Sequence, residues 1–229
     1  MQQTVQVRRL HDWALLPRKN HVDRSRAREE AAMLAAHFRY HRQFRQAEAC
    51  PPWVLGQELG WIIDSPVTIT VSPLDDVQVA PAGDAELREA GRLFGREEFW
   101  RRGEGYIAAT RNDWLRTCQY RGLSGSWEGM FIPNGQGSAE WRLGWSIRIP
   151  ESCFLLVTAL DENPGIMVPA GVLTARQAGR TWDEEGFSIA IRPERTVSLT
   201  RGQPIARIVL LSRDSLQVRI EETEGTGSS

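Results

Sequence analysis

The fold is decided by residues 141–220, which read WRLGWSIRIPESCFLLVTALDENPGIMVPAGVLTARQAGRTWDEEGFSIAIRPERTVSLTRGQPIARIVLLSRDSLQVRI. Short apolar runs alternate here with turn-forming Pro, Gly, Asp and Asn. The runs are Trp141–Ile149, Phe154–Ala159, Val168–Leu173, Phe187–Ile191, Thr196–Leu199, Ile205–Leu211 and Leu216–Ile220. Such runs, rich in Val, Ile, Leu and aromatic residues and separated by regular turns, predict an antiparallel β-sandwich or barrel.

A helix is expected near the N-terminus. Residues 24–49 are rich in Ala, Arg, Glu and Gln, and Asp23 can cap the start of a helix there. The apolar stripe of this segment consists of Ala27, Ala31, Leu34 and Phe38. Spacings of three and four residues place these side chains on one helical face. We therefore expect one long N-terminal α-helix that packs across the sheet, in a fold that is mostly β, or α+β by content.

Residues 84–137 contain many glycines, five of them between Arg121 and Gly137. Ala85–Phe94 could form a short helix, and the glycines around it discourage a longer one. We expect Arg121–Gly137 to form long loops over the sheet, where binding groups often lie. Residues 221–229 are acidic and then rich in Gly, Thr and Ser, which predicts a disordered tail. We expect a single domain over residues 1–220, because neither a linker nor an internal repeat is visible.

The 229-residue chain has a formal net charge of −1, so no global field favours nucleic acid or an anionic membrane. The first 49 residues are basic and the remainder is acidic, which favours docking of the two parts on each other. The three cysteines are widely spaced and form no zinc or disulfide pattern. No apolar run reaches membrane-spanning length. We expect a cytoplasmic protein with no nucleic-acid and no membrane partner.

Three parts of the sequence resemble a bacterial domain family of unknown function, DUF6065. The matching segments are Ala49–Trp53 with Leu59–Val67, Leu143–Pro150 with Leu155–Ala159, and Ala170–Leu173 with Trp182–Asp183, Phe187–Arg192 and Arg201–Ile205. The order of Trp182 and Asp183 is reversed relative to the family pattern, and residues 84–137 have no clear counterpart. The resemblance implies a β-rich fold and brings no established activity.

A further segment, Arg201-Gly-Gln-Pro-Ile-Ala-Arg-Ile-Val209, is similar to the final strand of the dUTPase and dCTP deaminase folds. This resemblance implies a β-clip-like arrangement and, as one alternative, a nucleotide-processing enzyme that is a trimer with nucleotide at the subunit interfaces. The chain lacks the Asp-containing uridine motif of those enzymes.

Two histidines form the candidate metal site. His37 and His41 are four residues apart, so a helix would place both rings on one face, as metal-binding helices do. A third ligand would have to come from Glu30, Glu48 or elsewhere. The alternative is that both histidines are interfacial polar residues beside the apolar stripe. We predict no cofactor, and a metal held by this pair is the minority alternative.

The candidate catalytic residues are a thiol and two acidic groups. Cys50 precedes a proline pair at a predicted helix end, and its alternative role is structural. The carboxylates are Asp161, Glu162, Asp183 and Glu184. Paired carboxylates beside strands can bind a cation or act as acid and base, although solvated turns have the same composition. No nucleophile elbow, P-loop or dinucleotide motif is present.

The nine tryptophans are more than a core of this size requires, and arginines lie among them in the sequence. We predict a ligand pocket that contains Trp127, Trp141, Trp145, Arg148 and Trp182. Such a pocket, between the sheet and the 84–137 loops, suits a small planar or anionic metabolite, for example in bacterial specialised metabolism. Packing of the core is the alternative role of the tryptophans. Whether the protein is an enzyme stays open.

Two other classes of function remain beside the small-molecule pocket. The nucleotide-processing enzyme is one, and the other is a non-catalytic interaction protein whose basic helix Arg24–Arg45 docks a partner. A homo-oligomer is compatible with each class.

Overall fold

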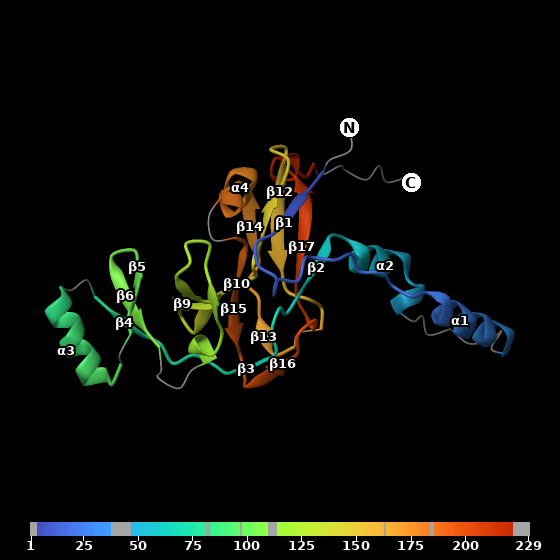
Figure 1. Cartoon of the computed structure of the whole chain (residues 1–229). Helices are drawn as coiled ribbons and strands as arrows, with labels where there is room; N and C mark the ends of the chain where they lie inside the picture. Colours follow the sequence, from blue (N-terminus) through green and yellow to red (C-terminus); the bar gives the residue numbers. More distant parts are fainter. Residues whose placement is uncertain are drawn as a thin grey trace, which may run out of the picture.

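The computed structural model describes residues 4–37, 47–80, 83–96, 98–109, 114–162, 164–183 and 186–221. Two four-stranded antiparallel sheets form its centre (Figure 1). The first has the order β14 (Gly171–Thr174), β12 (Cys153–Thr158), β17 (Pro204–Ser212) and β2 (Trp61–Asp64). The second has the order β13 (Ile166–Met167), β15 (Ser188–Pro193), β10 (Ser138–Arg142) and β9 (Phe131–Gly135).

Alternating burial along the strands explains why these two sheets share one core. In β12, Cys153, Leu155 and Val157 are buried and the residues between them are partly exposed. A strand turns successive side chains to opposite faces, so one face of each sheet is apolar. The largest fully buried side chains include Trp141, Phe131, Leu155 and Ile191 from the two sheets, Trp145 from β11 and Phe187 from just before β15. The predicted mostly-β antiparallel fold is confirmed, in its sandwich form.

Smaller sheets surround the sandwich. They are formed by β1 (Gln6–Arg9) with β11 (Trp145–Arg148), β3 (Ile69–Val71) with β16 (Val197–Leu199), β4 (Val77–Val79) with β6 (Gly105–Ala108) and β5 (Trp100–Arg102), and β7 (Gln119–Arg121) with β8 (Trp127–Gly129). The predicted run Trp141–Ile149 is divided between β10 and β11, because Gly144 with φ +73° turns the chain between them. The run Leu216–Ile220 forms no strand and is exposed, since no neighbouring strand pairs with it.

The short helix expected over Ala85–Phe94 is present, whereas the expectation of long loops in the rest of residues 84–137 is wrong. The segment contains α3 (Asp84–Phe94), the 3₁₀ turn η2 (Trp114–Arg116) and strands β5 to β9. Its glycines end elements rather than prevent them. Gly95, with φ +61°, caps the C-terminus of α3, and its N–H donates to the carbonyl of Gly91. In Figure 1, α3 and the β4–β6–β5 sheet form a lobe beside the sandwich.

The predicted N-terminal helix is only partly confirmed. It is present as α1 (Ser25–His37), and the Asp23 carboxylate accepts hydrogen bonds from Ser25 N–H at 2.9 Å and from Ser25 Oγ at 2.6 Å. Residues 38–46 lie outside the described residues. The 3₁₀ turn η1 (Ala47–Ala49) and α2 (Pro51–Glu58) follow.

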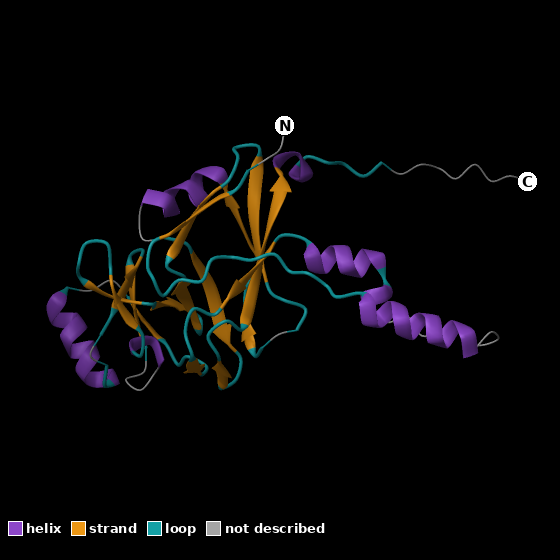
Figure 2. Ribbon diagram, turned by 45° about the vertical axis from the view of Figure 1, so that its right-hand side comes forward, coloured by secondary structure: helices purple, strands orange, loops and turns teal. Residues whose placement is uncertain are grey.

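The predicted packing of this helix across the sheet is wrong, because α1 projects away from the sandwich (Figures 1 and 2). Of the predicted stripe, Ala27 is buried and Ala31 is exposed. The other two members, the side chain of Leu34 and all of Phe38, lie outside what the structure describes. Instead α4 (Ala175–Asp183), whose Ala178-Gly179 pair suggests a turn in the sequence, packs against β11. The predicted tail from residue 222 onward lies outside the described residues. Among the helices described, none is sufficiently long and apolar to span a bilayer.

Gly60 joins α2 to β2 and offers a test of how closely this connection approaches β17. Its φ is +76°, and a Cβ atom there would lie 2.0 Å from the Ile208 carbonyl oxygen. We expect Gly60→Ala to lower the free energy of unfolding by at least about 2 kcal/mol, measured by urea denaturation. Gly56 is the matched control, because it is exposed in α2 and a Cβ atom there would have nothing within 4 Å. Gly56→Ala should stabilise slightly, and equal effects of the two variants would contradict the close approach.

Candidate functional site

The register of the first sheet brings three chain segments to one end of the sandwich. β12 lies between β14 and β17 and is antiparallel to both. Phe154 pairs with Thr174, and Cys153 pairs with Ser212. The start of β12 therefore meets the end of β14, where α4 begins, and the end of β17, where the 3₁₀ turn η3 (Arg213–Leu216) begins. The turn from β11 to β12 lies at the same end.

A cleft of about 710 Å³ lies between these segments. We call it the arginine cleft. Its charged and hydroxyl side chains are Arg148, Glu151, Thr174, Arg176 and Arg213, and its other lining residues are Ile149, Cys153, Phe154, Ala175 and Gly179. Arg148 comes from β11, Arg176 from α4 and Arg213 from η3. Three guanidinium groups from separate elements thus share one concave surface that also contains apolar side chains.

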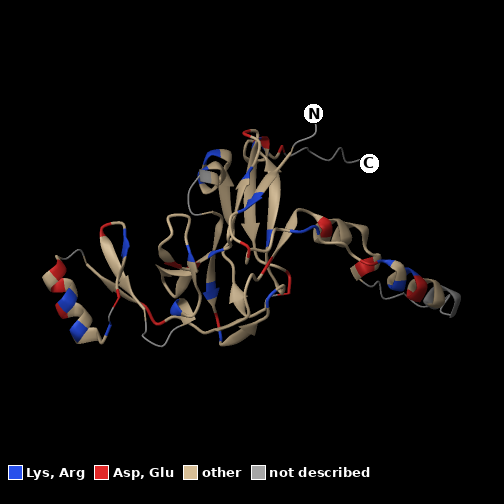
Figure 3. Ribbon diagram, in the orientation of Figure 1, with Lys and Arg blue, Asp and Glu red and all other residues tan. Residues whose placement is uncertain are grey.

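The positive charge of this cleft exceeds its negative charge. Glu151 is the one acidic side chain among the described residues that line it, and neither Arg176 nor Arg213 makes an ion pair with a described residue. The backbone of Arg213 is fixed, because its N–H donates to the Ser152 carbonyl at 2.8 Å. Figure 3 shows basic residues on α4 and on the neighbouring strand β1. The arrangement favours an anion.

The first turn of α4 adds to this field. Gln177 N–H donates to Thr174 Oγ1 at 3.2 Å, and Thr174 N–H donates to Gln177 Oε1 at 2.9 Å. This is a capping box, in which the residue before the helix and its third residue satisfy each other. The first backbone N–H groups of a helix have no intrahelical partner and carry the positive end of its dipole. Thr174, Ala175 and Arg176 at this end all line the cleft.

Trp182 holds the other end of α4 against β1 and β11. Arg8 is opposite Ser146 and Arg148 is opposite Gln6, so both arginines lie on the same face of the β1–β11 pair. The guanidinium carbon of each lies 4.6 Å from the centre of the Trp182 ring. Arg8 also donates to the Trp182 carbonyl. These cation–π contacts place Arg148 at the edge of the cleft.

The five predicted ligand-binding residues do not share one site. Arg148 and Trp182 are in contact, and Arg148 lines the arginine cleft. Trp141 and Trp145 are 0% exposed and pack in the core. Neither side chain presents a surface that a ligand could contact in this structure. Trp127 is 64% exposed on β8, beneath Arg121 at 5.4 Å. Indole suits a core and a pocket equally well, which is why the sequence did not separate them.

The predicted catalytic residues also lie apart. Cys50 precedes α2, Asp161 accepts a hydrogen bond from Gln57 Nε2, and Glu162 is exposed. None of these three lines the arginine cleft. The side chain of Asp183, at the end of α4, and all of Glu184 lie outside what the structure describes, and their roles stay predictions.

The metal prediction also falls largely outside the described part of the chain. His37 ends α1, but its side chain is not described, and neither is any part of His41. In the ranges that are described, no three His, Cys, Asp or Glu side chains are grouped so that they could hold a metal ion. A site built on the two histidines therefore stays a prediction.

Thr174, Arg176 and Arg213 are cleft residues that sequence reasoning missed. A local signal for the first two exists, because Thr174-Ala175-Arg176-Gln177 has the spacing of a capping box. Ala178 and Gly179 resemble a turn in the sequence, but both lie inside α4. Gly179 faces open space on the cleft side. No local pattern marks Arg213, which reaches the cleft only through the pairing of β17 with β12.

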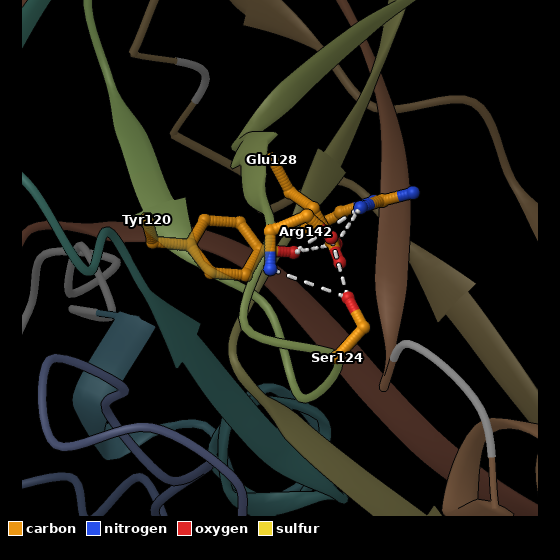
Figure 4. Close-up of polar contacts among 5 residues, drawn as sticks. Tyr120, Ser124, Glu128 and Arg142 are labelled. Carbon is orange, nitrogen blue, oxygen red and sulfur yellow. Dashed lines mark hydrogen bonds and ion pairs between the residues drawn. The ribbon is translucent and has the colours of Figure 1, made fainter.

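A second polar cluster lies away from this cleft (Figure 4). Arg142 Nη1 donates to Glu128 Oε2 at 2.5 Å and to the Tyr120 hydroxyl at 3.3 Å, and that hydroxyl donates to Glu128 Oε2 at 3.2 Å. Arg142 is 8% exposed. Burial raises the pKa of Tyr120, and the Arg142 charge opposes this effect. The cluster ties the β7–β8 hairpin to β10.

Two aromatic residues of the N-terminal segment cover this cluster. The His11 ring stacks on Trp13 at 5.3 Å and meets the edge of Tyr120 at 4.9 Å. Burial lowers the pKa of His11, while the negative charges of Glu128 and Asp12 act in the opposite direction. His11 is therefore held in its neutral form more strongly than a solvated histidine.

Neither a protein-family model nor a curated protein matches the chain. The resemblance to DUF6065 remains a prediction. Among solved structures, a mutant dUTPase from phage phi11 of S. aureus has 11% identity and a TM-score of 0.41, over 98% of this chain and 97% of that chain. A mutant dUTPase of Staphylococcus bacteriophage 80alpha has 11% identity and a TM-score of 0.41, over 99% and 97% of the two chains. Another 80alpha mutant, with dUpNHpp, has 11% identity and a TM-score of 0.39, over 99% and 91%.

The Arg142–Glu128 ion pair should contribute to stability. Glu128→Gln removes the negative charge and leaves a buried guanidinium, so we expect the free energy of unfolding to fall by about 2–3 kcal/mol in urea denaturation. Glu89→Gln on α3 is the control, because the Glu89–Arg92 pair is exposed. The control should leave stability unchanged. If Glu128→Gln is as stable as the native protein, the Arg142–Glu128 ion pair does not contribute to the free energy of unfolding.

The lowered pKa of His11 predicts a pH dependence. The unfolded chain takes up a proton near the ordinary pKa of 6.5, and the folded state takes it up at lower pH. The unfolded state therefore binds more protons in this window, and stability should fall as the pH drops through 6.5. His11→Gln should flatten this part of the profile, measured as unfolding free energy between pH 5 and pH 8. If the unfolding free energy of the variant depends on pH as steeply as that of the native protein, other groups cause the dependence.

Proposed function

We propose that the protein binds a small anionic molecule, with a phosphate or carboxylate group, in the arginine cleft. The observation that carries this proposal is the convergence of Arg148, Arg176 and Arg213 on one concave surface, although they are far apart in the sequence. Guanidinium groups cluster in this way at an energetic cost, because like charges repel. An anion that bridges them removes this repulsion.

The chemistry of the lining defines the ligand further. The planar fork of each guanidinium matches the oxygen atoms of a phosphate or carboxylate. The start of α4 adds backbone N–H donors, as helix N-termini do for anions. Ile149, Phe154 and Ala175 offer apolar contact for a planar or hydrocarbon part. The volume of about 710 Å³ lies within the range of small-molecule sites.

The proposal is one of binding, without a reaction. Of the described residues that line the cleft, Glu151 is the one carboxylate, and no histidine accompanies it. Cys153 lines the cleft but is only 1% exposed, with Ser152 Oγ at 3.8 Å from its sulfur.

Nucleotides are a specific form of the proposed ligand, because they combine a planar base with phosphate. The resemblance of Arg201–Val209 to the final strand of dUTPase folds supports this alternative. That segment forms most of β17, and β17 leads directly into Arg213 of the cleft. Nucleotides therefore belong among the ligands to be tested.

A partner-binding role for the N-terminal helices is the second alternative. Met33 of α1 is 60% exposed, and Leu55 and Leu59 in and after α2 are 65% and 56% exposed. These apolar side chains lie on the part that projects from the sandwich (Figure 2). A homo-oligomer or another protein could cover them.

Calorimetric titration with pyrophosphate and with dUTP tests the cleft. We expect Arg176→Ala and Arg213→Ala each to weaken binding by roughly tenfold to a hundredfold, because each removes charge-assisted hydrogen bonds of about 1.5–3 kcal/mol. Arg88→Ala is the matched control, since Arg88 is exposed on α3 and remote from the cleft. The control should bind as the native protein does.

A steric variant separates the effect of the cleft's shape on binding from the effect of its charge. Gly179 has no atom within 4 Å of a Cβ position, so Gly179→Leu should fold and fill part of the cleft. We expect it to weaken binding of dUTP while every arginine is retained. The proposal is contradicted if neither ligand binds the native protein. It is also contradicted if all three cleft variants bind as tightly as the native protein.

A further inference from the structure

A second cavity lies where the β4–β6–β5 sheet meets the turn from β9 to β10. Its volume is about 330 Å³. The turn contributes Gln136, β4 contributes Gln78 and β5 contributes Arg102, and we call the cavity the Gln136 pocket. It shares no lining residue with the arginine cleft. In Figure 1, β9 lies on the side of the sandwich that faces the lobe with β4, β5 and β6.

The strand register gathers the polar side chains of this sheet on one face. Gln78 pairs with Ile107, and Arg102 pairs with Gly105. Paired residues project from the same face of a sheet, and residues 105 and 107 are two apart on β6, so all four share one face. A Cβ atom on Gly135 of β9 would lie 3.1 Å from Arg102 Nη1 and 3.5 Å from Gln78 Nε2. The guanidinium and the amide therefore meet beside the end of β9.

Gln136 is held in a conformation that glutamine rarely adopts. Its φ is +57°, and among the described residues it is the one residue other than glycine with a positive φ. Gln136 and Gly137 form a two-residue turn between β9 and β10, in which asparagine or glycine is the usual first residue. The Asp76 carboxylate fixes the turn, because it accepts hydrogen bonds from Gln136 N–H at 3.0 Å and from Gly137 N–H at 2.6 Å. A residue that is unfavourable for its turn and lines a cavity indicates a role for its side chain.

The polar side chains of the pocket are available to a ligand. Those of Gln78, Arg102 and Gln136 make no hydrogen bond and no ion pair with any residue in the described ranges. A ligand therefore does not have to displace a protein partner. Arg102 is the one charged side chain among the residues that line the pocket, so the pocket favours a ligand with an anionic group.

We propose that the Gln136 pocket binds a sugar acid, that is, a monosaccharide with a carboxylate group. Arg102 recognises the carboxylate, because its planar fork of donors matches two carboxylate oxygens. Each glutamine amide offers both donors and an acceptor, so the two amides match groups that donate and accept hydrogen bonds. Hydroxyl groups do both, whereas a second carboxylate only accepts and an ammonium group only donates. A ligand with one carboxylate and several hydroxyls thus satisfies all three side chains.

The size of the pocket restricts the ligand to a single sugar unit. A volume of 330 Å³ holds roughly eleven water-sized groups at about 30 Å³ each, which corresponds to one monosaccharide. Gly105 leaves room opposite Arg102, because it has no side chain. Ile107 lines the pocket and offers apolar contact to the C–H face of a sugar ring. D-Glucuronate and D-galacturonate are the probes.

Calorimetric titration of the full chain tests the inference. We expect saturable binding of at least one of the two sugar acids. Binding of D-glucose, which lacks the carboxylate, and of cyclohexanecarboxylate, which lacks the hydroxyls, should be at least about tenfold weaker. The proposal is overturned if neither sugar acid binds, or if either analogue binds as tightly as the sugar acid.

Two variants test the residues of the pocket. Arg102→Gln should weaken binding of the sugar acid at least about tenfold. Its matched control is Arg101→Gln, which should bind as the native protein does, because Arg101 is exposed and projects from the opposite face of β5. Gln136→Gly should weaken binding by a similar factor while its thermal midpoint is no lower than that of the native protein, since glycine adopts a positive φ without steric cost. Native affinity in Arg102→Gln or in Gln136→Gly would overturn the proposal.

The double variant Arg176→Ala/Arg213→Ala separates this inference from the proposed function, because a sugar acid is also an anion. Its changes lie outside the Gln136 pocket, so it should bind the sugar acid as the native protein does. Loss of sugar-acid binding in the double variant would place the ligand in the arginine cleft and overturn the inference. Failure of pyrophosphate and dUTP to bind the native protein would contradict the proposed function alone.

Discussion

The stacking of Trp145 on Phe187 fixes the strand on which the arginine cleft depends. The ring centres are 4.6 Å apart and the planes differ by 14°, with both side chains at most 1% exposed. Phe187 N–H donates to the Trp145 carbonyl at 2.6 Å, so the backbone and the rings hold the same two segments together. β11 is thereby anchored to the chain that enters β15. Its outer face carries α4, and its edge carries β1.

The position of α4 then determines where charge can gather. One face of the helix borders the arginine cleft, in which arginines outnumber acids. Trp182 holds the helix end between Arg8 and Arg148, and Thr174 caps its start. Because the helix is fixed at both ends, the cleft can bind an anion without a change in the fold. The Gln136 pocket depends on a different constraint, the hydrogen bonds of Asp76 to the β9–β10 turn.

Local patterns predicted much of the fold but little of the site. The strands β12, β15, β16 and β17 follow from apolar runs and turn residues, because alternating burial leaves a direct trace in the sequence. Helix α4 leaves a weaker trace, since it carries Gly179 and few large apolar residues. Arg148 and Trp182 were predicted from the mixture of arginine and tryptophan. Arg213 could not be, because its place in the cleft is set by the register of β17 against β12, which is a tertiary property.

The central claim is that the arginines of β11, α4 and η3 form one anion site. The most direct test is a crystal structure of the full chain soaked with selenate, whose selenium is located by anomalous scattering. The account predicts a peak in the arginine cleft, with selenate oxygens about 2.7–3.2 Å from guanidinium nitrogens of Arg176 and Arg213. An ordered crystal with selenate bound elsewhere and none in an accessible cleft would contradict it.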